Sequence, residues 1–198
     1  MKGFLPFAVC FALLVHVWHS HYIYSRRYGL QTTYSIFLNS ALLFVVLFYV
    51  YPLKFLFTLT LGGLFGATTV PEQELRAMIE DRQVPALMII FSVGYAAVFA
   101  VFALLYRYAY SKRRELDLNE YESLRTRNDM IHYAVVANVG LLTAMTAALL
   151  PVGISFLSVF LLLLSAVYGL ASKPILRKKE KLALERVQAA GAATAAQP

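Results

Sequence analysis

Residues 4–24 read FLPFAVCFALLVHVWHSHYIY, and this stretch decides the fold class. It contains no Asp, Glu, Lys or Arg over 21 residues. At 1.5 Å of rise per residue, a helix of this length crosses the roughly 30 Å hydrocarbon core of a bilayer. Arg26 and Arg27 follow soon after, as is typical of a helix that ends at a membrane surface. We therefore predict a transmembrane helix over residues 4–24.

Four further segments are long and apolar enough to span a membrane. The last two are separated by LLPVGIS, in which Pro151 and Gly153 are expected to break the helix and form a tight hairpin. The sequence thus predicts an all-α integral membrane helical bundle of about five transmembrane helices, at residues 4–24, 36–53, 85–106, 131–150 and 154–171.

The composition of the chain agrees with this fold class. Of its 198 residues, 60% are apolar and only 15% are charged, and the mean hydropathy is +0.63. Such a composition is typical of a membrane protein, so the lipid bilayer is an expected partner. The formal charge of +7 lies in short basic blocks beside apolar runs, which is a pattern of membrane topology, so no nucleic acid is expected as a partner. The single Cys10 excludes an intramolecular disulfide.

The distribution of basic residues predicts the orientation. If the amino terminus lies outside, the inner flanks of the spans hold 14 of the 18 Lys and Arg residues, and Arg26 and Arg27 act as topology anchors. We therefore expect a multi-pass protein of the cell membrane with its amino terminus outside and its carboxyl terminus inside. Residues 1–172 would form a single transmembrane domain. Residues 173–198, basic and then Ala-rich, would form a partly disordered cytoplasmic tail.

The end of the second span is marked by Pro52 and Lys54, which suggest that the membrane segment stops there. The following residues, KFLFTLTLGGLFG, are compatible with a helical extension, an interfacial segment or a short re-entrant piece. The sequence leaves these three alternatives open.

Three histidines, His16, His19 and His21, raise the question of a metal site. At about 100° per residue, His21 lies about 140° from His16 and 200° from His19, so the three cannot point at one ion. The predicted spans also contain no Asp or Glu. We therefore expect no metal, no cofactor and no enzymatic activity, because such sites in membranes usually draw on several carboxylates or more histidines.

The fourth span carries one amide, Asn138, which we interpret as an intramembrane polar residue that makes a helix-packing hydrogen bond. Small residues recur on one face of the same span, a pattern that favours close helix packing. These residues are Ala137, Gly140, Ala144 and Ala147.

Several motif positions resemble a known family. The segments LPFAVCFALLVHVWHSHYIYSRR and IFLNSALLFVVLFYVYPLKF are similar to the second and third helices of the transmembrane-protein-175-like potassium channels of bacteria and lysosomes. The matching positions are Trp18, His21, Arg26, Arg27, Leu38, Asn39 and Pro52. The later segments FSVGYAAVFAVFALLYRYA and ELDLNEYESLRTR resemble the back half of bacterial members. The resemblance implies a six-helix unit and a pore shared between subunits around an axis.

The resemblance also implies a polar cluster of Trp18, His21 and Asn39 that packs two helices together. Trp18 and His21 lie near the inner end of the first span, and Asn39 lies near the inner start of the second. An antiparallel hairpin therefore places them at similar depth, where interhelical hydrogen bonds contribute roughly 0.5 to 2 kcal/mol each.

One departure from the family concerns its signature, an Arg-x-x-x-Phe-Ser-Asp-Gly stretch on the pore-lining first helix. These 198 residues contain no such stretch, and FSVG at 91–94 has Val93 in place of the aspartate. We therefore expect the pore-lining helix to be missing from this chain.

Three functions remain open. The first is potassium conduction by a homo-oligomer, with potassium ion as the transported partner. The second is a non-conducting membrane protein of the same fold with a packing or regulatory role. The third is a small-molecule transporter, although the sequence offers neither an inverted repeat nor an intramembrane charge for it.

Overall fold

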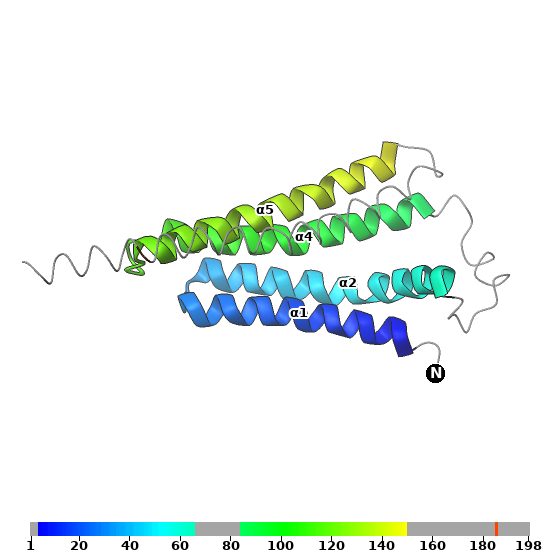
Figure 1. Ribbon diagram of the computed structural model, residues 1–198, viewed down its shortest axis with the longest axis horizontal. Coiled ribbons are helices and arrows are strands. Elements are labelled where there is room, and N and C mark those ends of the chain that lie inside the picture. The colour runs from blue at the N-terminus through cyan, green and yellow to red at the C-terminus, as the bar shows by residue number, and fades with distance from the viewer. Residues whose placement is uncertain (1–3, 66–83, 150–184, 186–198) are drawn as a thin grey trace, which may run out of the picture.

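The computed structural model describes residues 4–65 and 84–149, together with Glu185, and consists of four long helices in that part of the chain (Figure 1). They are α1 (Phe4–Tyr28), α2 (Thr33–Phe65), α4 (Val84–Ser111) and α5 (Glu120–Leu149). All four are long and apolar enough to cross a membrane. The prediction of an all-α membrane bundle is confirmed. The expected fifth span at 154–171 and the tail division at 172/173 lie outside the described residues.

The helices form two antiparallel hairpins that lie side by side (Figure 1). The first hairpin pairs α1 with α2, and the second pairs α4 with α5 over the most extensive contact in the described part of the chain. The two hairpins meet mainly where α2 packs on α4. The end of α1, the start of α2, the end of α4 and the start of α5 therefore lie at one end of the bundle, which we call the inner end after the orientation expected from the sequence.

Local capping explains where the helices begin and end at the inner end. Gly29 ends α1 with a φ of 55° and donates its N–H to Ser25 O at 3.0 Å, a left-handed cap that suits glycine. The side chains of Asn119 and Glu122 cap each other's backbone N–H groups at 3.0 and 3.2 Å, so α5 begins in this polar segment. The helix thus starts 11 residues before the predicted 131 because the cap, not the first apolar residue, fixes its beginning.

The second helix is longer than its predicted membrane span. Pro52 lies inside α2, and the helix continues through it to Phe65. The helix thus continues beyond the predicted end of the membrane span near Lys54. The part of α2 that is long and apolar enough to cross a membrane, Thr33–Val50, ends close to that prediction. Of the three alternatives for the residues after Pro52, the helical extension is the observed one. Proline removes one backbone hydrogen bond, and membrane helices tolerate this loss where local adjustment satisfies the freed carbonyl.

The contact between α4 and α5 depends on small residues, as the sequence predicts. Ala137, Gly140, Ala144 and Ala147 are all buried. A Cβ placed on Gly140 would lie 3.0 Å from the Cβ of Ala96, so the missing side chain allows the two backbones to approach closely. In lipid, such close van der Waals contact is a main source of helix association.

Candidate functional site

A cluster of tyrosines joins the two hairpins at the inner end. Tyr24 and Tyr28 of α1 lie with their ring centroids 5.2 and 5.9 Å from that of Tyr106 on α4, and Tyr133 of α5 stacks on Tyr106 at 5.3 Å. The hydroxyl of Tyr24 donates to Leu105 O at 3.1 Å. Tyrosine suits this position because its ring packs like an apolar group and its hydroxyl needs a partner when buried.

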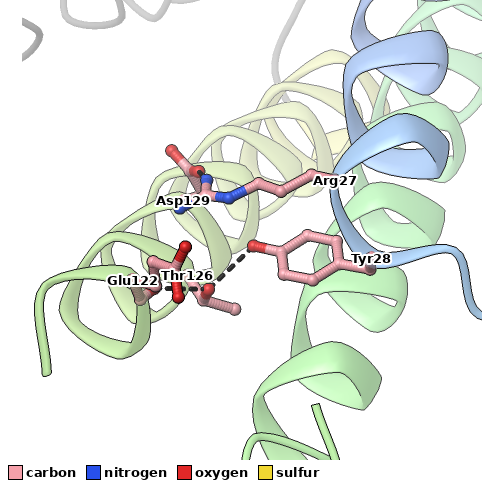
Figure 2. A network of polar contacts seen from close by, with 5 residues as sticks. All are labelled: Arg27, Tyr28, Glu122, Thr126 and Asp129. Atoms are coloured by element: carbon pink, nitrogen blue, oxygen red, sulfur yellow. Dashed lines mark hydrogen bonds and ion pairs between the residues drawn. The ribbon is translucent and has the colours of Figure 1, made fainter. Parts of the chain in front are cut away.

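Two side-chain contacts connect α1 directly to α5 (Figure 2). The hydroxyl of Tyr28 lies 2.7 Å from Thr126 Oγ1, which itself donates to Glu122 O at 2.7 Å. Because the single hydroxyl hydrogen of Thr126 is used in that bond, the Tyr28 hydroxyl is the donor to Thr126. Next to it, Arg27 Nη1 lies 3.5 Å from Asp129 Oδ2 in a partly exposed ion pair. We call these two contacts the α1–α5 bridge.

The structure brings two of the three predicted cluster residues into hydrogen-bond contact. His21 Nε2 lies 3.1 Å from Asn39 Oδ1, so α1 and α2 are joined by a hydrogen bond at this depth. Because the amide oxygen can only accept, His21 is the donor. The Trp18 ring lies 6.0 Å from the His21 ring but is 68% exposed on the outside of the hairpin.

The other predicted polar residues are placed as follows. Asn138 is exposed on α5 and donates to Ala134 O of its own helix at 2.8 Å. An interhelical bond of Asn138 therefore stays a prediction. Arg26 is exposed, whereas Arg27 is partly buried in the α1–α5 bridge. Across the described part of the chain, no three His, Cys, Asp or Glu side chains gather closely enough to hold a metal ion.

Sequence reasoning missed Tyr28, Thr126 and Asp129. The predicted fourth span begins at residue 131, which leaves Thr126 and Asp129 outside the predicted membrane helices. An available signal was the position of Asp129 directly before the apolar run, close to the level of Arg27 in a bundle of antiparallel helices. Its pairing with Arg27 could not be read from the spacing, because 102 residues separate the two.

The loop between α4 and α5 is held by its own polar contacts. Lys112 Nζ donates to Glu115 Oε1 at 2.7 Å, and this bond raises the pKa of the Lys112 ammonium above its ordinary value. Arg113 donates to Tyr110 O at 3.2 Å. Lys112 and Glu115 therefore partly compensate each other's charge on the exposed surface of this loop.

These features define a multi-pass helical membrane protein with a tightly packed inner end. No family model matches the sequence. A potassium channel of Marivirga tractuosa is 39% identical over 158 residues, which cover 77% of this chain, and the chain spans 63% of that relative's length. A crystal structure of a variant of the potassium channel MtTMEM175, in complex with a nanobody–MBP fusion protein, matches with a TM-score of 0.77 and 36% identity, covering 90% of this chain and 79% of that one.

The chain belongs to the transmembrane-protein-175-like family of potassium channels. The resemblance inferred from Trp18, His21 and Asn39 is thus confirmed at the level of the family.

Proposed function

We propose that the chain conducts potassium as a subunit of a homo-oligomer whose pore is shared between subunits. The observation that carries this proposal is its similarity to two potassium channels, one of which it matches over 90% of its own length at a TM-score of 0.77. No enzymatic activity and no cofactor form part of the proposal.

The packing of the described helices supports a pore between subunits rather than within one. At the inner end the space between the helices is filled by side chains that are at most 2% exposed, including Tyr24, Phe102, Leu105 and Ala109. A hydrated path through this core would have to displace close-packed aromatic rings. An ion path at a subunit boundary avoids that displacement.

We place the protein in the cell membrane with its amino terminus outside. The end of α1, the end of α4 and the start of α5 lie together (Figure 1), and the exposed arginines of all three helices gather there. A single basic end of the bundle is what the positive-inside rule requires of a cytoplasmic side.

Within the subunit, we infer that Trp18, His21 and Asn39 hold the first hairpin together. The 3.1 Å hydrogen bond between His21 and Asn39 supports this role, since a polar side chain in hydrocarbon is stabilised by a partner on a neighbouring helix. Trp18 lies on the same helix as His21, with the two ring centroids 6.0 Å apart. We assign Asn138 a helix-packing role on the outer face of α5.

Potassium flux from liposomes tests the proposed conduction. The purified 198-residue chain is reconstituted in vesicles loaded with potassium, and proton-coupled dye quenching reports the efflux. We expect efflux above that of protein-free vesicles, with a steeper than linear dependence on protein density if subunits must assemble. Absence of efflux from a helical, monodisperse preparation would contradict the proposal.

The second candidate is a non-conducting protein of the same fold with a packing or regulatory role. It is favoured by one observation, namely that the 198 residues contain no Arg-x-x-x-Phe-Ser-Asp-Gly stretch. A stable oligomer without potassium efflux in the same assay would select this candidate.

A further inference from the structure

Three exposed arginines lie at one level around the inner end of the bundle. They are Arg26 on α1, Arg107 on α4 and Arg127 on α5, and all three side chains are exposed. We call them the arginine ring. Because they come from three helices, they distribute positive charge around the bundle rather than concentrating it in one pocket.

Neighbouring contacts fix this common level. Arg26 precedes Arg27, which pairs with Asp129, and Arg127 follows Thr126, which accepts the hydrogen bond of Tyr28. Arg107 follows Tyr106, whose ring lies 5.9 Å from that of Tyr28. Each arginine is thus one residue, or about 1.5 Å of helix rise, from a residue that contacts another helix at the inner end.

The charge of the ring is not compensated by the described parts of the protein. Within these parts no carboxylate pairs with Arg26, Arg107 or Arg127. Asp129, the acid at this level, pairs with Arg27.

The ring lies within two helical turns of the ends of the membrane-crossing segments. The segments of α1 and α4 end at Tyr28 and Ser111, two and four residues after Arg26 and Arg107, and that of α5 begins at Glu120, seven residues before Arg127. Tyr22 and Tyr34 are 49% and 43% exposed near these ends, and exposed tyrosines prefer the headgroup region. The arginine side chains therefore reach the depth at which lipid phosphates lie.

We propose that the arginine ring is a docking surface for anionic phospholipids of the leaflet at the inner end. A guanidinium group binds phosphate oxygens through two parallel N–H donors, and each cation near a negative leaflet favours anionic lipid by about fivefold. The ring would thereby surround the subunit with a shell of anionic lipid and fix its depth in the membrane. This assignment does not depend on ion conduction.

A comparison of two charge-matched variants tests the proposal. The full chain is titrated with phosphatidylglycerol in detergent micelles, with phosphatidylcholine as the neutral lipid, and bound lipids are counted by native mass spectrometry. The variant Arg26→Gln/Arg107→Gln/Arg127→Gln removes the ring. The control Lys112→Gln/Arg113→Gln/Arg114→Gln removes the same charge from the α4–α5 loop, beyond the last residue of α4.

We expect the ring variant to bind phosphatidylglycerol on the order of tenfold more weakly, and the control to stay within about twofold of the wild type. Equal weakening in both variants would show a non-specific effect of total charge and would overturn the proposal, as would unchanged binding in the ring variant. If the glutamine variant does not fold, the variant Arg26→Lys/Arg107→Lys/Arg127→Lys, which keeps the charges, is tested in its place. Because lysine lacks the two parallel donors, this variant should prefer phosphatidylglycerol over phosphatidylcholine less strongly than the wild type, and a preference equal to that of the wild type would contradict the docking surface.

Discussion

The hydrogen bond between His21 and Asn39 is the clearest residue-level contact within the first hairpin. We expect Asn39→Ala to lower the free energy of unfolding in detergent by about 0.5 to 2 kcal/mol, because the imidazole then loses its partner in an apolar environment. A double-mutant cycle with His21→Ala measures the coupling by thermal or denaturant unfolding. Additive effects of the two substitutions would mean that the hydrogen bond contributes nothing.

A second residue-level prediction concerns Gly140, where α4 and α5 approach closely. We expect Gly140→Leu to destabilise the protein by about 1 to 3 kcal/mol, because the new side chain collides with Tyr95 and Ala96. Ala148→Leu introduces the same side chain on the exposed face of the same helix and should be nearly neutral. Equal melting temperatures for the two variants would argue against the observed helix contact.

At this scale the sequence allows only part of the site to be predicted. The common depth of His21 and Asn39 follows from their positions at the ends of two consecutive apolar runs. The contacts of Tyr28 with Thr126 and of Arg27 with Asp129 depend on how two hairpins dock, and no local pattern encodes that docking. The exposure of Trp18 was likewise not predictable, because an aromatic residue fits both a packed interface and a lipid-facing surface.

Among the helices, the α1–α5 bridge is a side-chain contact that joins the two hairpins at the inner end. We expect Tyr28→Phe to cost about 1 kcal/mol of unfolding free energy, because it removes the hydrogen bond to Thr126 and leaves the ring packing intact. Tyr22→Phe removes a hydroxyl from the exposed side of α1 and serves as the matched control. A Tyr28→Phe variant as stable as this control would count against the bridge.

The orientation of the helices can be measured with cysteine labelling. In a Cys10→Ala background, Glu115→Cys places one thiol in the exposed α4–α5 loop. We expect this thiol to resist a membrane-impermeant maleimide in intact cells and to react after permeabilisation, because the proposed orientation places the basic end of the bundle in the cytoplasm. Labelling in intact cells to the same extent would reverse the proposed topology.

Apolar length alone was sufficient to predict the described helices but not their boundaries. Runs free of charge identified the four membrane-crossing segments, since hydrocarbon tolerates little else. The start of α5 was placed too late because the Asn119–Glu122 cap lies in a charged segment. The sequence did not decide whether α2 continues past Pro52, because a proline can either end a helix or be accommodated inside it.

In the part of the chain that the structure describes, two hairpins pack together through apolar surfaces. In this part, hydropathy predicts where the helices lie better than which helices are neighbours. The small residues on α5 predicted a tight helix contact but did not identify the neighbouring helix. The structure shows that this neighbour is α4, because Ala96 packs against Gly140. The motif positions on α1 and α2 were sufficient to identify the family, because both the residue types and their spacing match those of the family.

Single-channel recording in a planar bilayer tests the central claim most directly. The purified chain is added under a KCl gradient, and the MtTMEM175 channel prepared in the same way serves as the positive control. We predict discrete current steps that reverse close to the potassium equilibrium potential. A silent bilayer from a folded, oligomeric preparation, in the presence of normal currents from the control, would contradict potassium conduction by this chain.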